Sequence, residues 1–196
     1  MEFYLVRHGR TELNGQGLLL GNSDPDLADI NDPLIVDWKN TLKEHNFTHL
    51  IHSGMKRTEQ TIQLLAKELA LDYPLLIDKR IRELDFGDWE LKSYDWLYQN
   101  EIELFSRWIA NPYDTAPPNG ETLQELKKRI CEFFEEWSHK KVEGLILIAT
   151  HGGPIRLLWS FLHQTDVFDK EAAPATVYQL NWSKKTISQV TRSSGE

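Results

Sequence analysis

Two apolar runs in this chain each end in a histidine that is followed by glycine. The first run, residues 3–6, leads into Arg7 and His8, and the second, residues 144–150, leads into His151. Short apolar runs bounded by glycine are typical of strands buried in a parallel sheet. Ligands bind beyond the carboxyl ends of such strands. If the two strands are neighbours, the two imidazoles face one another across a pocket.

Strands and amphipathic helices alternate along the rest of the chain. This order predicts an α/β fold: a three-layer sandwich in which helices cover both faces of a mostly parallel, mixed sheet. A short turn joins the last two strands, which indicates an antiparallel edge. The predicted strands cover residues 2–6, 49–53, 74–78, 144–150, 177–182 and 187–190, and the predicted helices cover 33–45, 56–71, 93–109, 122–137 and 154–163.

The domain organisation is expected to be simple. The length of 196 residues suits one domain, residues 1–196, and no repeat or linker divides it. Residues 84–120 are interpreted as an insertion over one end of the sheet. Residues 11–31 form a long loop rich in Gly, Asn and Asp, and loops of this length are usually functional. Residues 193–196 are expected to fray.

Composition excludes several classes of partner. The net charge of −8 argues against non-specific binding to nucleic acid or membranes, so an anion site must be a local positive pocket. No apolar stretch is long enough to span a bilayer. The one cysteine, Cys131, cannot form an intrachain disulfide, and the N-terminal residues do not read as a secretory signal. A cytoplasmic protein is therefore expected.

The residues at the strand ends suit a phosphate group. The guanidinium groups of Arg7 and Arg57 can grip phosphate oxygens with paired hydrogen bonds. Gly152 and Gly153 allow the backbone to approach a ligand closely, and the helix that follows presents free N–H groups. The three histidines at 45, 49 and 52 do not predict a metal site, since His49 and His52 point to opposite faces of a strand.

Five ordered motifs complete this picture, and together they resemble the histidine phosphatase superfamily, in its phosphoglycerate mutase-like branch. The resemblance covers residues 3–163. Its motifs are RHGRT at 7–11, the serine-to-threonine helix start at 53–61, RELDFGDWE at 82–90, PPNGET at 117–122 and THGGPIR at 150–156.

The resemblance implies a phosphatase that uses neither metal nor cofactor. In such an enzyme His8 is the nucleophile that becomes phosphorylated, and Glu83 is the general acid that protonates the leaving oxygen. The groups implied to hold the phosphoryl oxygens are Arg7, Arg57 and His151. The implied substrate-binding positions of the loop are Thr11, Asn14 and Gly21. Gly152 is a fourth substrate-binding position, because its backbone can approach the ligand closely.

The acidic segment after Glu83 narrows the substrate class. Residues 84–106 contain one cation, Lys92, against six acidic residues, which favours a monophosphate ester with an uncharged or bulky organic part and water as the acceptor. Within the family, this segment and PPNGET most resemble the α-ribazole-5′-phosphate phosphatases of cobalamin nucleotide-loop synthesis. A broad-specificity phosphatase, a phosphoglycerate mutase-type phosphotransferase and a non-catalytic phosphate-binding module stay open. The expected partner is a small phosphate monoester, with a homodimer left open. The aromatic residues that a flat substrate could contact are Trp89, Tyr94 and Trp96.

Overall fold

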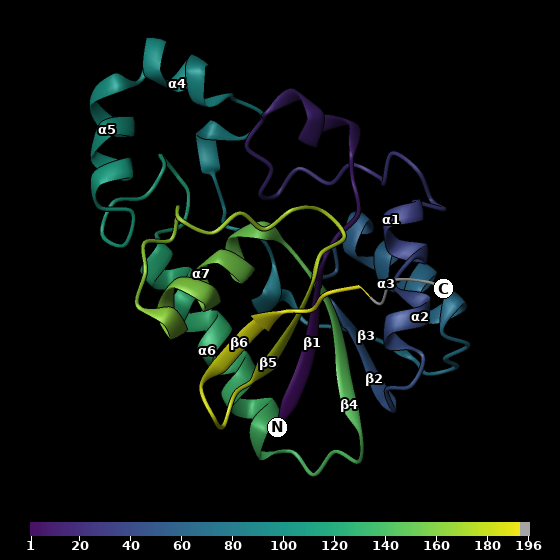
Figure 1. The fold of residues 1–196 in the computed structure, drawn as a ribbon. Helices are drawn as coiled ribbons and strands as arrows, with labels where there is room; N and C mark the ends of the chain where they lie inside the picture. Colours follow the sequence, from purple (N-terminus) through teal and green to yellow (C-terminus); the bar gives the residue numbers. More distant parts are fainter. Residues whose placement is uncertain (193–196) are drawn as a thin grey trace.

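A six-stranded sheet forms the centre of the computed structural model, which describes residues 1–192; the end expected to fray, 193–196, lies outside them. Its strands are β1 (Glu2–Arg7), β2 (Phe47–His52), β3 (Leu75–Ile77), β4 (Leu145–Thr150), β5 (Val177–Asn181) and β6 (Thr186–Gln189). They lie in the order β3-β2-β4-β1-β5-β6. The first four run parallel, and β5 and β6 add an antiparallel edge, which confirms the predicted mixed sheet (Figure 1).

Helices cover both faces of this sheet, as predicted (Figure 1). Alternate residues of β1 belong to different cores: Phe3 and Leu5 pack in the cluster that includes residues of α6 and α7, whereas Tyr4 and Val6 pack in the cluster on the side of α3. The helices are α1 (Pro33–Val36), α2 (Lys39–Leu42), α3 (Lys56–Glu68), α4 (Tyr94–Asn100), α5 (Ile102–Ala110), α6 (Leu123–His139) and α7 (Gly152–His163).

The long helix α6 shows how the sequence produces these layers. Thr122 caps its first turn through a reciprocal pair of hydrogen bonds with Glu125. Its buried stripe includes Phe134, whose ring meets the ring of Phe3 edge-on with centroids 5.0 Å apart. Burying one phenylalanine contributes about 1.5–3 kcal/mol to folding, so such contacts hold α6 against the sheet.

Two predicted helices are each broken in two, which corrects the sequence interpretation. Residues 33–45 form α1 and α2, because the indole of Trp38 donates to the carbonyl of Ala175 at 2.6 Å and lies buried between them. Residues 93–109 form α4 and α5. The first of these ends at Asn100, whose side chain donates to the carbonyl of Trp96 at 2.8 Å and competes with the helical pattern.

Helices α4 and α5 lie beyond the carboxyl ends of the parallel strands, at the top left of Figure 1. The loop of residues 11–31 covers the same end of the sheet, and a β-bridge between Leu18 and Ser93 joins the two segments. None of the helices built by residues 1–192 is long and apolar enough to cross a membrane.

Candidate active site

The register of the sheet brings the two histidines together. Arg7 pairs with Thr150 across the parallel strands β1 and β4, and the backbone N–H of His8 donates to the carbonyl of Thr150 at 3.0 Å. The ring centroids of His8 and His151 lie 5.2 Å apart at an interplanar angle of 63°. Both side chains are buried. The facing pair expected from the two strand ends is therefore present in the structure.

The His8 ring is held in one protonation form. Its Nδ1 lies 2.7 Å from the carbonyl oxygen of Gly9, and a carbonyl can only accept a hydrogen bond, so Nδ1 carries the proton. Burial and the nearby charges of Arg7 and Arg57 hold the pKa of His8 well below its ordinary value. At neutral pH the ring is uncharged, and its Nε2 has a free lone pair.

A chain of hydroxyl groups orients the His151 ring. The Nε2 of His151 lies 2.8 Å from Ser53 Oγ, which lies 2.8 Å from Thr58 Oγ1. Thr58 donates its proton to the carbonyl of Met55 at 2.7 Å, so it accepts from Ser53, which accepts from His151. The Nδ1 of His151 is buried without a partner. Burial, followed by the charge of Arg57, holds the pKa of His151 well below its ordinary value.

Arg7 lies beside these rings at the N-terminus of α7. Its Nη1 donates to the carbonyl of Ala172, and its Nε is buried without a partner. A Cβ added to Gly152 would lie 3.4 Å from Arg7 Cζ, which is an ordinary contact distance, so the guanidinium group packs beside this residue. Part of the Arg7 donor set therefore remains available to a ligand.

Arg57 occupies a different environment. It is fully buried and donates to the carbonyls of Ser23 and Gly21 at 2.6 and 3.0 Å. Asp24 lies 3.7 Å from its guanidinium. The structure thus places Arg57 under the loop of residues 11–31, where it ties that loop to α3.

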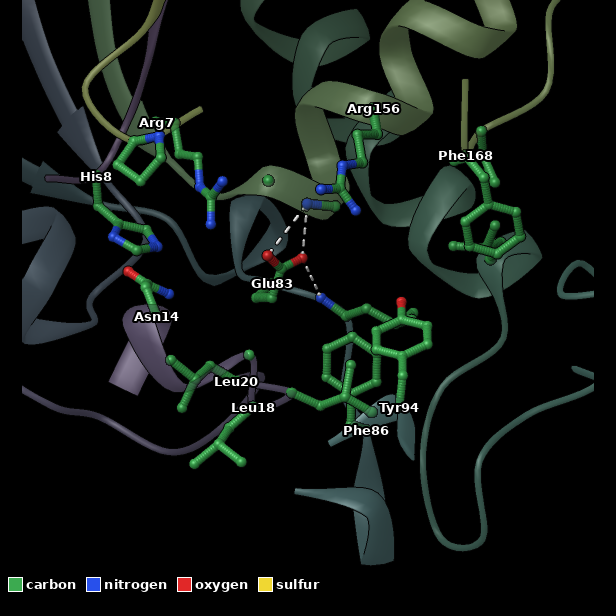
Figure 2. Close-up of a pocket in the computed structure, with 18 of the residues that line it drawn as sticks. Arg7, His8, Asn14, Leu18, Leu20, Glu83, Phe86, Tyr94, Arg156 and Phe168 are labelled. Carbon is green, nitrogen blue, oxygen red and sulfur yellow. Dashed lines mark hydrogen bonds between the residues drawn. The ribbon is translucent and has the colours of Figure 1, made fainter. Parts of the chain in front are cut away.

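Glu83 lies at the first turn of α7, as the dashed lines of Figure 2 show. Its carboxylate accepts hydrogen bonds from the backbone N–H of Gly153 at 2.9 and 3.1 Å and from its neighbour Leu84 at 2.9 Å. Arg129 of α6 donates to the Glu83 carbonyl at 2.8 Å and binds both oxygens of Glu121 at 2.7 Å. Side chain and backbone of Glu83 are therefore both fixed.

The loop that follows His8 is ordered by local hydrogen bonds. Thr11 and Asn14 cap each other at the start of the short 3₁₀ helix η1 (Glu12–Gln16). Further along, the Glu90 carboxylate accepts from the backbone N–H of Gly21 at 2.8 Å. A Cβ at Gly21 would collide with the carbonyl of Leu84 and with Glu90. Position 21 of this loop can therefore accommodate only glycine.

A cavity of about 370 Å³ opens between these groups (Figure 2). Of the nine residues proposed from the sequence, five line it: Arg7, His8, Asn14, Glu83 and Gly152. The other four, Thr11, Gly21, Arg57 and His151, are not among its lining residues, although His151 packs against His8. The roles of all nine stay predictions.

The remaining walls include residues that the sequence analysis did not single out. Tyr94 does line the cavity, but Trp89 is 1% exposed and belongs to the core, and Trp96 packs against Lys92 instead. Of these additional lining residues, only Arg156 could have been found from the sequence, because it is the last residue of the motif THGGPIR. The lining residues not foreseen include Leu18, Leu20, Phe86, Arg156, Phe168 and Pro174.

His49 of β2 and His45, which precedes that strand, each pack against an aromatic ring. His45 stacks on Phe47 with centroids 5.8 Å apart, and His49 meets Trp137 edge-on at 5.6 Å. Across residues 1–192 no group of three or more His, Cys, Asp or Glu side chains is arranged to hold a metal ion.

Solved structures with the same architecture support the predicted fold class. The α-ribazole phosphatase of Shigella flexneri aligns with a TM-score of 0.81 at 24% identity, over 99% of this chain and 96% of that one. A mycobacterial glucosyl-3-phosphoglycerate phosphatase, solved with VO3, aligns with a TM-score of 0.81 at 20% identity, over 98% and 99%. At these identities the likeness shows the fold, and it confirms the expected α/β sandwich.

Sequence comparison identifies the family as well as the fold. A protein of Escherichia coli O1:K1 named "Probable phosphoglycerate mutase GpmB" is 30% identical over 152 residues, which are 78% of this chain and 70% of that protein. The family model of the histidine phosphatase superfamily (branch 1) matches residues 3–193. The resemblance drawn from the five motifs is thus confirmed, and with it the expectation of a phosphatase-type enzyme. The chain belongs to branch 1 of the histidine phosphatase superfamily.

Proposed function

We propose that the chain is a phosphomonoester hydrolase in which His8 carries the phosphoryl group between substrate and water. One observation carries this proposal: the unprotonated Nε2 of His8 and the carboxyl group of Glu83 belong to the same cavity. A neutral imidazole is a good nucleophile, and a covalent intermediate divides one difficult displacement into two easier ones. Phosphoryl transfer requires positive charge, which Arg7 supplies, and fixed positions, which the hydrogen bonds of the two histidines supply.

In the first step His8 Nε2 attacks phosphorus, and the bond from phosphorus to the alcohol oxygen breaks. Glu83 acts as the general acid and gives its proton to that oxygen. In the second step water attacks the phosphohistidine, Glu83 takes the proton of the water, and the nitrogen–phosphorus bond breaks. Inorganic phosphate leaves, and His8 and Glu83 return to their starting forms.

The cavity walls favour an ester with a bulky organic part. Leu18, Leu20, Phe86 and Phe168 add apolar surface beside the proposed reaction centre (Figure 2). Among family members, α-ribazole-5′-phosphate phosphatases act on such an ester, and we propose α-ribazole 5′-phosphate as the first candidate substrate. The test is a panel of phosphate monoesters compared by kcat/KM. A flat profile would favour a broad-specificity phosphatase instead.

A phosphoglycerate mutase is the second candidate, and the 30% identity to a protein of that name favours it. The two activities differ in the acceptor of the phosphoryl group, which is water in a hydrolase and a second hydroxyl in a mutase. Release of inorganic phosphate without interconversion of phosphoglycerates supports the hydrolase. Interconversion without release supports the mutase, and absence of both would leave a non-catalytic phosphate-binding module.

Metal chelation is expected to leave turnover unchanged, because the positive charges of the proposed mechanism come from protein side chains. The measurement is initial rate after dialysis against EDTA, with and without added Mg²⁺, Mn²⁺ or Zn²⁺. An enzyme inactivated by the chelator and restored by one of these ions would contradict the proposed mechanism.

Replacing Gly153 with alanine is expected to lower kcat by about 10²-fold, since displacement of a catalytic group by about 1 Å costs this much. A Cβ at Gly153 would collide with the Glu83 carboxylate and push it from the N–H that holds it. Gly15→Ala is the matched control, because nothing lies within 4 Å of a Cβ there. Equal rates in the two variants would show that Glu83 need not occupy this position.

A further inference from the structure

Arg156 is a half-buried cation without a partner inside the cavity. It lies in the first turns of α7 and lines the cavity with Arg7. None of the hydrogen bonds or ion pairs found among residues 1–192 involves its guanidinium group, and its Nε is buried without an acceptor. Two other arginines of the described chain, Arg10 and Arg107, also lack partners, but both are exposed to water.

An uncompensated guanidinium at this place carries a free-energy cost. Its donors are partly removed from water, and the neighbouring cation Arg7 repels it. Glu83 is the one acidic residue among those that line the cavity, and its carboxylate is occupied by the N–H groups of Gly153 and Leu84. No acceptor among residues 1–192 is therefore paired with Arg156, which leaves its guanidinium group open to a ligand in the cavity.

The position of Arg156 indicates which part of the ligand supplies that acceptor. In Figure 2 His8 lies to the left of Glu83, whereas Arg156, Tyr94 and Phe168 lie to its right. An ester whose phosphorus is at His8 and whose leaving oxygen is at Glu83 would extend its alcohol part toward these residues. Arg156 is then beside the organic part of the substrate rather than beside the phosphoryl group.

Resting on the function proposed above, we propose that Arg156 forms a subsite for a pair of oxygen acceptors on the alcohol part of the ester. The guanidinium fork binds two oxygens at once, as in a carboxylate or a vicinal sugar diol, and Tyr94 and Phe168 add aromatic surface to the same cavity. The substrate class is a monophosphate ester with such an oxygen pair close to the ester bond and an apolar part beyond it. Arg156 thus supplies, from α7, a cation for the organic part of the substrate, whereas residues 84–106 contain only one cation, Lys92, which does not line the cavity.

The test compares matched esters with the Arg156→Met and Arg156→Lys variants. One pair is adenosine 5′-monophosphate and its 2′,3′-dideoxy analogue, and the other is 3-phosphoglycerate and 2-hydroxypropyl phosphate, in which a methyl group replaces the carboxylate. Arg156→Met should raise KM and lower kcat/KM by about 10- to 100-fold on the esters that carry the oxygen pair, the range expected for charged hydrogen bonds. The dideoxy analogue, 2-hydroxypropyl phosphate and 4-nitrophenyl phosphate should change by less than about threefold.

The two arms distinguish the source of the oxygens: a loss confined to the nucleotide pair assigns a diol, and a loss confined to the phosphoglycerate pair assigns a carboxylate. Arg156→Lys should restore the carboxylate arm in part, since it keeps the charge but loses the fork. Arg107→Met is the matched control, because it removes an exposed, unpartnered arginine.

Equal losses on all esters, 4-nitrophenyl phosphate included, would place Arg156 at the phosphoryl group and overturn the subsite. No loss on any ester would overturn it as well. In both cases hydrolysis of 4-nitrophenyl phosphate by the wild-type enzyme still reports on the proposed function, so the two proposals fail separately. Circular dichroism and the Tm of each variant show whether a loss reflects unfolding.

Discussion

Replacing His8 with alanine is expected to remove turnover almost completely and to abolish the covalent phosphoryl-enzyme. The loss should reach about 10⁴-fold or more, since without the nucleophile only binding and charge stabilisation remain. The measurement is a rapid quench of wild type and variant after mixing with a radiolabelled phosphate ester. The wild type should retain label that is stable in base and released by acid, as phosphohistidine is.

Peptide mapping under basic conditions should locate the label at His8. His139→Ala is the control, because its side chain is 74% exposed at the end of α6 and does not line the cavity. His8→Gln keeps a polar side chain of similar length and separates loss of the nucleophile from loss of packing. A labelled wild type and an equally labelled, fully active His8→Ala variant would contradict the mechanism.

Replacing Glu83 with glutamine is expected to slow esters of alkyl alcohols by about 10²- to 10⁴-fold, the usual contribution of a general acid. Aryl phosphates should change only a few-fold, because their leaving oxygen needs little protonation. The amide keeps an oxygen that can accept from the N–H groups of Gly153 and Leu84, so the local structure should persist. The variant therefore removes the acidic proton donor and keeps the side chain at residue 83 in its place.

The rate of phosphorylation in a single turnover is the quantity to compare, because hydrolysis of the intermediate does not depend on the alcohol. A plot of its logarithm against the pKa of the leaving alcohol should become steeper in Glu83→Gln. Asp88→Asn serves as the control, since Asp88 lies in the same loop and accepts a hydrogen bond from Asn119. Equal losses on alkyl and aryl esters would remove Glu83 from the proposed role.

The parts of the fold that the sequence predicts well are those with strong local signals. The run before His8 and the run before His151 each combine buried apolar residues with a following glycine, and both became central strands of the sheet. The facing imidazoles follow from this pairing alone. Glu83 was identified through the family motifs alone, because it lies in an irregular segment that has no helical or strand periodicity.

The parts that escaped prediction depend on contacts between distant residues. At the break between α1 and α2, the indole of Trp38 donates to the carbonyl of Ala175, which lies 137 residues away. Phe168 reaches the cavity from a connection between α7 and β5 that has neither helical nor strand periodicity. Arg156 lies on a helix that the sequence does predict, yet its missing partner becomes visible only once its surroundings are known.

One carboxylate sets the shape of the loop beside the cavity. Glu90 accepts from the backbone N–H groups of residues 21–23, and Arg57 binds carbonyls of the same stretch from below. Three stretches far apart in sequence are therefore coupled by direct hydrogen bonds, and substitutions in any two of them should not have additive effects. A chimera that exchanges residues 11–31 alone with those of a relative would separate the loop from its anchors, whereas one that also exchanges residues 57 and 90 would carry the loop's conformation with it.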